Sequence, residues 1–250
     1  MEYVYQKTYC PKKYKHKYTN QKNMARNTLT LKKLIFPPIA EHKLSQLMID
    51  DESIKYITFA NTAQEITNAI MNNLIDFPCP EFCRDKKWEK MSLINRMKSL
   101  VITDMTAGVG GNVLNFAKYF KYVNAIEIDD LRYNYLNKNI DLYGFRNVNC
   151  YHCNSLDMLI DGNDIVQDII FFDPPWGGKD YKLHDSLRLV FENLAIESIC
   201  KVIFQKSYNK MIILKLPNNY DFDYLQSEMI EFQVFKYSLD RMSLIVIKNY

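Results

Sequence analysis

The sequence predicts an α/β fold with a mostly parallel sheet, helices on both faces, a terminal antiparallel strand and a small N-terminal helical extension. Three observations support this prediction. From residue 100 onward, short apolar runs alternate with segments of helical periodicity, as in parallel sheets with crossover helices. Acidic residues directly follow three of these runs, where ligands bind in such folds. The 250 residues, with 48% hydrophobic content, are also enough to bury one large core.

The elements follow in order from the local pattern. Upstream of the sheet, Thr62 is a candidate N-cap for a helix that ends before Pro78 and Pro80. Further helical segments are expected from residue 113, between the second and third strands, and over 185–206. Strands are expected at seven apolar runs, of which the last two form an antiparallel pair: 100–103, 122–126, 148–153, 168–172, 211–216, 232–238 and 243–248.

A glycine-rich loop follows the first predicted strand. Asp104 ends the strand, and Gly108, Gly110 and Gly111 would let the backbone approach a ligand closely. Glu127 ends the next strand about twenty residues later, where a carboxylate meets the ribose hydroxyls of a nucleoside. The glycine spacing differs from that of pyrophosphate binders, and the loop has no Walker lysine. Asp104 therefore suits the cationic methionine portion of S-adenosyl-L-methionine, unless it only caps the following helix.

Further candidates for this methyl-donor site lie beside these residues. Asn154 and Ser155 follow the third predicted strand, where the adenine amino group would be met, although a plain turn explains them equally well. The complete set predicted to bind the donor lies at or after the ends of the first four strands: Asp104, Thr106, Gly108, Gly110, Asn112, Glu127, Ile128, Ser155 and Asp173.

The segment 173–178, Asp-Pro-Pro-Trp-Gly-Gly, follows the predicted strand at 168–172 and indicates chemistry on an exocyclic amino group of a nucleobase. Such an amine is a poor nucleophile because its lone pair is delocalised into the ring. Asp173 can accept one N–H of the amine, and the Pro174 carbonyl can accept the other. Trp176 offers a flat face for the base. A Pro-rich turn would explain the prolines but not the Asp, Trp and glycines, so we predict Asp173, Pro174 and Trp176 as catalytic residues.

The stretch from about residue 54 to 220 resembles the trimethylguanosine synthase family, which methylates the N2 amine of a 7-methylguanosine RNA cap. Several segments carry the resemblance: Ile54-Lys55 and Phe59; Gly108 to Asn112 (family C-G-V-G-G-N); Asn139 with Tyr143-Gly144 (N-x-x-x-Y-G); Asp173 to Tyr181 (S-P-P-W-G-G-P-x-Y); and Leu216 to Asn218 (L-P-x-N). The resemblance implies a class I Rossmann-like methyltransferase fold and a 7-methylguanosine-capped RNA substrate. It also implies a cap-binding set: Trp176, Asn139, Tyr181, Lys55 and Asn218.

Trp176 would stack on the methylated guanine, whose positive charge an indole face attracts. Asn139 would contact the base edge, and Lys55 and Tyr181 the cap phosphates. These three residues are equally explained as ordinary surface residues. Asn218 stands where the family often has a basic phosphate contact.

Asp173 departs from the serine that is usual in the family and resembles the D-P-P-[YFW] motif of adenine and ribosomal-guanine methyltransferases. We expect Asp173→Ser, which restores the family residue, to keep substantial activity. Lys179 replaces a proline. The first expectation is a cap guanine-N2 methyltransferase acting in mRNA processing. The alternatives are methylation of internal adenine or guanine, and an inactive RNA-binding subunit of a capping assembly. Intact Asp104, Glu127 and Asp173 argue against the inactive subunit.

The chain divides into three predicted parts: a basic, Tyr-rich arm over 1–34, a helical extension over 35–95 and the methyltransferase domain over 96–250. The charge of the arm sets it apart from the rest of the chain. Residues 1–33 hold nine Lys or Arg and one acidic residue, which leaves 23 basic and 28 acidic residues elsewhere. The arm is either an RNA contact or a solvated, disordered tail.

No signal peptide or long apolar run is evident, so we expect an intracellular monomer, in the nucleus or cytoplasm, without membrane contact. The six cysteines do not have the spacing of a disulfide framework. Cys150 and Cys153 lack a second pair, so no metal is expected.

Overall fold

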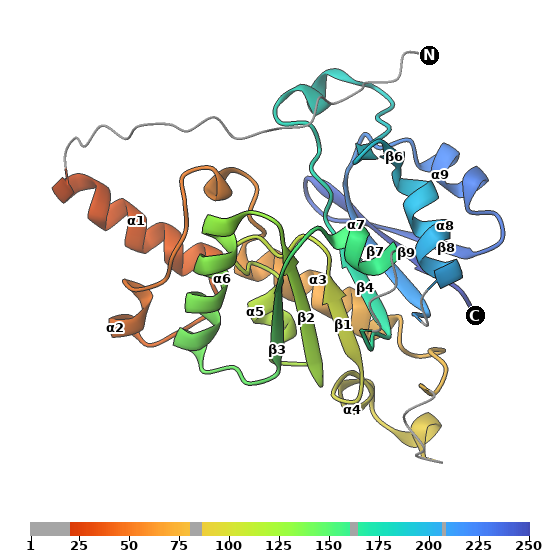
Figure 1. Cartoon of the computed structure of the whole chain (residues 1–250), viewed down its shortest axis with the longest axis horizontal. Coiled ribbons are helices and arrows are strands. Elements are labelled where there is room, and N and C mark those ends of the chain that lie inside the picture. The colour runs from red at the N-terminus through yellow and green to blue at the C-terminus, as the bar shows by residue number, and fades with distance from the viewer. Residues whose placement is uncertain (1–20, 81–86, 161–164, 207–208) are drawn as a thin grey trace.

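The computed structural model describes residues 21–80, 87–160, 165–206 and 209–250. Its centre is a seven-stranded sheet in the order β3-β2-β1-β4-β7-β9-β8 (Figure 1). β9 pairs antiparallel with β7 and β8, whereas the pairs among β3, β2, β1, β4 and β7 are parallel. The expected parallel sheet with a terminal antiparallel strand is therefore confirmed. The strands are β1 (Val101–Asp104), β2 (Tyr122–Glu127), β3 (Val148–His152), β4 (Ile169–Phe172), β7 (Met211–Pro217), β8 (Gln233–Ser238) and β9 (Met242–Lys248).

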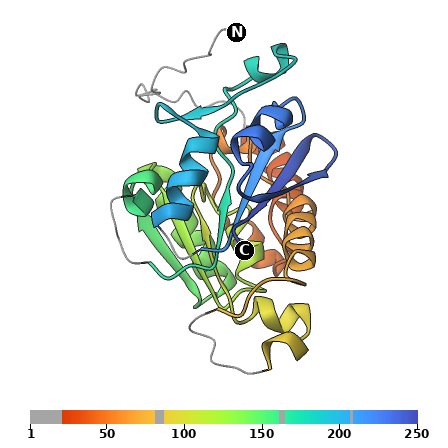
Figure 2. The same cartoon turned by 90° about the vertical axis from the view of Figure 1, so that its right-hand side faces the viewer.

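Helices cover both faces of the sheet, as Figures 1 and 2 show. Alternate side chains of β4 belong to different cores: Ile169 and Phe171 pack on the side of α1, α3, α5 and α6, whereas Ile170 and Phe172 pack on the side of α7, α8 and α9. The helices are α1 (Gln21–Ile35), α2 (Glu41–Leu44), α3 (Ala60–Asn72), α4 (Leu93–Met97), α5 (Val113–Phe116), α6 (Asp130–Tyr143), α7 (Ser155–Ile160), α8 (Ile196–Lys206) and α9 (Phe222–Glu228), with 3-10 turns η1 (Ser53–Lys55), η2 (Trp88–Lys90) and η3 (Asp180–Leu183).

The N-terminal extension is part of the core. Ile35 at the end of α1 and Ile66 and Ile70 on α3 are completely buried. The predicted boundary at residue 34 lies one residue before the end of α1, whose last residue, Ile35, packs in the core. The rest of the predicted arm, residues 1–20, lies outside the described residues.

Two predicted helices are shorter than expected. The segment 185–206 becomes helical only at Ile196, and before it β5 (Val190–Phe191) and β6 (Leu194–Ala195) form a small hairpin. The hairpin turn places Glu192 and Asn193 at φ of 50° and 67°, a left-handed backbone that no helix can contain. The helix after the glycine loop, α5, ends at Phe116, and residues 117–119 form turns.

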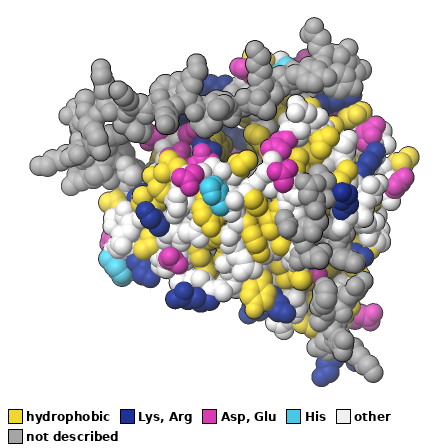
Figure 3. Space-filling view, viewed as in Figure 1, with side chains coloured by type: hydrophobic (Ala, Val, Ile, Leu, Met, Phe, Trp, Pro, Cys, Tyr) yellow, Lys and Arg dark blue, Asp and Glu magenta, His cyan; other side chains and the backbone are white. Residues whose placement is uncertain are grey.

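None of the helices in the described part of the chain is long and apolar enough to span a membrane. On the face shown in Figure 3, acidic and basic side chains are interspersed with hydrophobic ones. The charge of this face is therefore mixed.

Candidate active site

Three carboxylates gather at the carboxyl ends of neighbouring strands. Asp104 ends β1 and is 1% exposed, Glu127 ends β2 and is 8% exposed, and Asp173 follows β4 directly. Because β1 lies between β2 and β4, these ends meet at one edge of the sheet. Burial, together with the nearby Asp173 and Glu127 carboxylates, raises the pKa of Asp104 to about 7. The site is therefore poised to bind positive charge.

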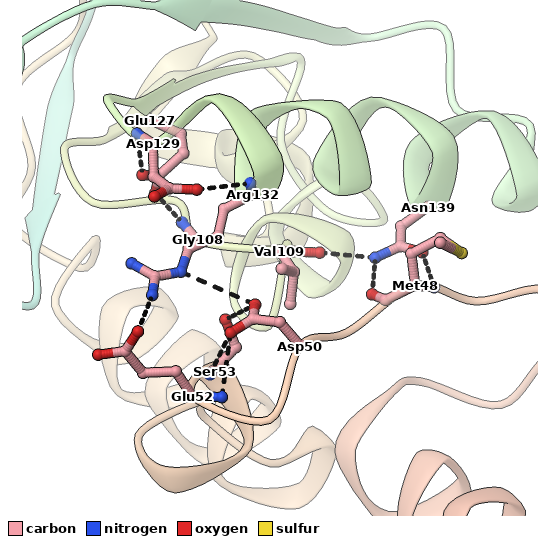
Figure 4. A network of polar contacts seen from close by, with 10 residues as sticks. All are labelled: Met48, Asp50, Glu52, Ser53, Gly108, Val109, Glu127, Asp129, Arg132 and Asn139. Atoms are coloured by element: carbon pink, nitrogen blue, oxygen red, sulfur yellow. Dashed lines mark hydrogen bonds and ion pairs between the residues drawn. The ribbon is translucent and has the colours of Figure 1, made fainter. Parts of the chain in front are cut away.

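Glu127 holds the glycine loop in place. Its Oε2 accepts the backbone N–H of Gly108 at 2.7 Å, and its Oε1 accepts that of Asp129 at 2.8 Å (Figure 4). Burial raises the pKa of Glu127, and these two N–H groups oppose the shift. Each carboxylate oxygen keeps a lone pair, so the group can also accept hydroxyl protons from a ligand.

Two glycines of the loop are required by geometry. Gly110 has φ of +105°, which side chains rarely adopt. A Cβ on Gly111 would lie 2.8 Å from Cγ1 of Ile57 and 2.9 Å from the carbonyl oxygen of Thr58. The N-terminal extension thus packs directly on the loop, and Asn112 donates from Nδ2 to Oγ1 of Thr58 at 3.1 Å. Oδ1 of Asn112 is buried and has no hydrogen-bond partner among the described residues.

A second tie between extension and domain runs through Arg132 on α6. Its Nη2 donates to Oε2 of Glu52 at 3.0 Å, and its Nε lies 3.8 Å from Oδ2 of Asp50 (Figure 4). Asp50 in turn accepts the backbone N–H of Ser53 at 2.9 Å. The guanidinium also opposes the rise in the pKa of Glu127 that burial causes. The extension therefore helps set the charge beside the glycine loop.

Thr106 joins the glycine loop to the segment after β4. Its hydroxyl donates to the Asp173 carbonyl at 3.0 Å and lies 3.3 Å from the Asp173 backbone N–H. Its own backbone N–H donates to Oδ1 of Asp104 at 3.1 Å. Thr106 therefore fixes the position of Asp104 relative to Asp173.

Lys215 on β7 belongs to the site although the sequence interpretation did not include it. This lysine is 3% exposed, and its Nζ lies 2.5 Å from Oδ2 of Asp173. Its carbonyl accepts the indole N–H of Trp176 at 3.2 Å, and its ammonium lies 5.3 Å from the centre of that ring. The available signal was a single charge inside an apolar strand, which requires a buried partner.

Trp176 and Tyr181 are brought together as expected for neighbouring parts of one motif. Their ring centroids are 5.3 Å apart and the rings are nearly perpendicular, at 79°. Trp176 is half-buried, and Pro174 is buried. The indole therefore has a fixed edge on β7 and a partly accessible ring beside Asp173.

A family model described as RNA cap guanine-N2 methyltransferase matches residues 99–245, which include all of these strands and the site they build. The chain belongs to the RNA cap guanine-N2 methyltransferase family. The uncharacterized protein L320 of Acanthamoeba polyphaga mimivirus is 58% identical over 224 residues, 90% of this chain and 88% of L320.

Two trimethylguanosine synthases are more distant relatives of this family member. The Schizosaccharomyces pombe protein is 27% identical over 127 residues, 49% of this chain and 45% of the synthase. The Saccharomyces cerevisiae protein is 30% identical over 129 residues, 50% of this chain and 40% of the synthase. The chain thus matches less than half the length of each synthase.

Solved structures agree on the fold. The T. thermophilus 16S rRNA N2 methyltransferase RsmC has a TM-score of 0.53 at 13% identity, covering 81% of this chain and 44% of its own. A putative class I S-adenosylmethionine-dependent methyltransferase of Listeria monocytogenes has a TM-score of 0.51 at 13% identity, covering 84% and 66%. The fold is that of class I methyltransferases, whose methyl donor is S-adenosyl-L-methionine.

The residues at the strand ends fit this cofactor. Asp104 supplies a buried acid for a cationic group, and Glu127 supplies free lone pairs for hydroxyls. Ile128, directly after Glu127, is 62% exposed, so it offers an apolar surface at the same edge. Ser155 is buried at the start of α7, while Asn154 caps that helix by accepting the Leu156 N–H at 2.8 Å. The described residues contain no group of three or more His, Cys, Asp or Glu arranged to hold a metal ion.

Two members of the expected cap-binding set have other partners. The amide of Asn139 is completely buried and bonded on both sides to the protein backbone, so the expectation that it contacts a base edge is contradicted. Asn218 is exposed, but it donates to the Asp240 carbonyl at 3.2 Å and accepts the Ser243 hydroxyl at 2.9 Å. Asn218 therefore fastens the β8–β9 turn. Lys55 is exposed on η1 and stays a candidate phosphate contact.

Proposed function

We propose that this chain transfers methyl groups from S-adenosyl-L-methionine to the exocyclic N2 amine of a 7-methylguanosine RNA cap. The observation that carries the proposal is the half-buried indole of Trp176 beside the Asp173 carboxylate, with its N–H anchored on β7. An indole face attracts the positively charged 7-methylguanine by about 0.5 to 2 kcal/mol. Membership of the cap guanine-N2 family supports the same substrate.

The donor is proposed to lie along the ends of β1 and β2. The Asp104 carboxylate faces its cationic methionine portion, Glu127 accepts from its ribose hydroxyls, and Ile128 contacts its adenine. When bound, the donor supplies a methyl group on a positively charged sulfur. Asp104 gains stabilisation from that charge because its carboxylate is buried with two other acids and has little water to offset the repulsion.

The protein's own part in the reaction is mainly to position and polarise the amine. Asp173 accepts one N2 hydrogen and the Pro174 carbonyl accepts the other, which localises the lone pair on nitrogen. Bond formation between N2 and the methyl carbon would accompany breakage of the carbon–sulfur bond. The electrons of the broken bond would stay on sulfur. The proton lost from N2 passes to the Asp173 carboxylate and on to water. Holding the reactants in line contributes most of the rate increase.

The phosphates of the cap are proposed to meet Lys55 from η1 and Tyr181 from η3. Lys55 is exposed, and Tyr181 touches Trp176, so it lies next to the proposed base site.

A second candidate is methylation of an internal guanine or adenine, and Asp173 favours it as the first residue of a D-P-P-W motif. RsmC, which shares the fold, is a ribosomal RNA N2 methyltransferase solved with AdoMet and guanosine.

One experiment separates the two functions. Radiolabelled S-adenosyl-L-methionine is offered with 7-methyl-GTP, GTP, uncapped RNA and DNA in parallel, with a Trp176→Ala variant as background control. Labelling of 7-methyl-GTP in preference to the others supports the cap proposal. Equal labelling of GTP and 7-methyl-GTP, or labelling of internal bases, would replace it with the second candidate.

A further inference from the structure

The Asp173 carboxylate is paired with a buried lysine at a distance of 2.5 Å. We propose that Lys215 is a positioning residue that keeps Asp173 ionised and turned so that its second oxygen is left for the substrate amine. This inference rests on the proposed function, because it assumes that Asp173 accepts an N–H from the methylated base.

The contacts of Lys215 go beyond an ordinary ion pair. The Nζ bonds Oδ2 of Asp173, which leaves Oδ1 without a partner from Lys215. The backbone carbonyl of the same residue accepts the indole N–H of Trp176, and the ammonium lies 5.3 Å from the centre of that ring. One residue thus orients both the proposed hydrogen acceptor and the proposed stacking face.

Asp173 needs this cation to work as an acceptor. Among the described residues, the charged group that acts on Asp173 is Lys215 on β7, while Asp173 in turn raises the pKa of Asp104 at the end of β1. Burial raises the pKa of Asp173, and the Lys215 ammonium opposes that shift. Without the lysine, the rise in the pKa of Asp173 that burial causes would be unopposed, and Asp173 would keep its proton to a higher pH. A protonated carboxyl has lost acceptor capacity and gained a donor.

The pair also explains how an aspartate can stand directly before Pro-Pro-Trp, at the position where the family that the chain resembles has a serine. A neutral serine needs no cation, whereas Asp173 needs Lys215 and Lys215 needs Asp173. Replacing either residue alone leaves a buried charge without its partner, which is strongly destabilising. Asp173→Ser alone is therefore expected to lose activity, contrary to the expectation from the motif. Activity should therefore be kept better when Asp173 and Lys215 are replaced together than when either is replaced alone.

The test uses four variants of the full chain: Lys215→Met, Asp173→Ser, the double variant and Lys248→Met. Lys248 is a matched control, because it is also 3% exposed and pairs with a carboxylate, Asp76, at 2.6 Å. It lies on β9 opposite Met211, at the other end of β7 from the motif. The measurements are thermal unfolding, donor affinity by calorimetry, and kcat and KM on 7-methyl-GTP from pH 6 to 9.

Lys215→Met is expected to lower kcat at neutral pH by about 10- to 100-fold, with a smaller change in KM. Its kcat should rise towards high pH, because Asp173 then loses its proton. The double variant should be more stable than either single variant and, at neutral pH, more active, and its kcat should lack that rise. Lys248→Met leaves a carboxylate, Asp76, that is half-exposed, so it should lose less stability and keep the wild-type kcat and pH profile.

Wild-type kcat and pH profile in Lys215→Met would overturn the inference, as would an Asp173→Ser variant that is as active as the double variant. Failure of the proposed function is a separate result: the wild type would then label an internal base and not 7-methyl-GTP. In that case the same variants are assayed on that base, and the pH profile decides the role of Lys215 in the same way. Additive losses of stability in the double variant would also count against the pair, since coupled residues are non-additive.

Discussion

Asn139 on α6 forms two hydrogen bonds with the backbone of Met48: its Oδ1 accepts the N–H at 2.7 Å and its Nδ2 donates to the carbonyl at 2.9 Å. Nδ2 also donates to the Val109 carbonyl in the glycine loop at 2.9 Å. One buried amide therefore ties the N-terminal extension, α6 and the donor loop together (Figure 4). This position makes Asn139 a structural residue.

Asn139→Ala is expected to destabilise the protein by about 2 to 4 kcal/mol, because three buried backbone groups lose their partner. Denaturant unfolding measures the loss. Asn218→Ala, at an exposed turn, should cost less than about 1 kcal/mol and serves as the control. A variant of Asn139 with normal stability and a specific loss of 7-methyl-GTP affinity would restore the base-contact interpretation.

Trp176→Ala should weaken 7-methyl-GTP binding by about 1 to 3 kcal/mol, roughly 5- to 150-fold in affinity, because the stacking face is lost. Donor affinity should be preserved. The loss should be smaller for GTP, whose base carries no positive charge. Trp176→Phe keeps an aromatic face and should retain part of the affinity. Equal losses for both nucleotides, measured by fluorescence or calorimetry, would contradict stacking on a cationic base.

Affinity for S-adenosyl-L-methionine should fall as the pH is lowered through about 7. The pKa of Asp104 lies near that value without donor, and its protonated form no longer attracts the cationic methionine portion. Asp104→Asn should bind the donor weakly at every pH. Asp168→Asn is the control, since Asp168 is partly buried, with a pKa raised to about 6, but accepts the backbone N–H of Val101 at the start of β1. A pH-independent donor affinity in the wild type would remove Asp104 from the donor site.

The same carboxyl should make the free protein less stable as the pH rises. Unfolded Asp104 loses its proton near its ordinary pKa of 3.8, whereas the folded residue keeps it until about 7. Its contribution is therefore fully present below about pH 4 and is lost as the pH rises through 7, by at most about 4 kcal/mol. Asp104→Asn should raise the free energy of unfolding at pH 8 and change it little at pH 4. The free energies of unfolding are measured in urea without donor. If Asp104→Asn changes the free energy equally at both pH values, the pKa of Asp104 is not raised.

Deleting residues 1–20 tests the basic arm, because the structure places the following helix α1 against the core. Binding to long capped RNA should weaken and become less dependent on salt, since fewer counterions are released from phosphates. Activity on 7-methyl-GTP should change little. If both substrates lose activity equally, the segment contributes to the fold instead.

Much of the sheet was predictable because buried strands leave a local signal. The apolar runs that end at Asp104, Glu127 and Phe172 all became strands within one or two residues of the expected bounds. The helix predicted over 185–206 was partly wrong because the apolar residues of a short hairpin, around Val190 and Leu194, also suit a helix. Local pattern does not distinguish these two structures when neither extends beyond a few residues.

The sequence by itself determined the succession of strands along the chain, the acids at their ends and the Asp-Pro-Pro-Trp segment, because each depends on residues within one short stretch of chain. Only the tertiary structure decided which side chains satisfy one another. Asn139 resembled a ligand contact but bonds Met48, 91 residues away, and Lys215 looked like a strand residue but holds Asp173, 42 residues away. Burial without a hydrogen-bond or charge partner is costly, so the partner defines the role, and partners that distant meet only in the fold.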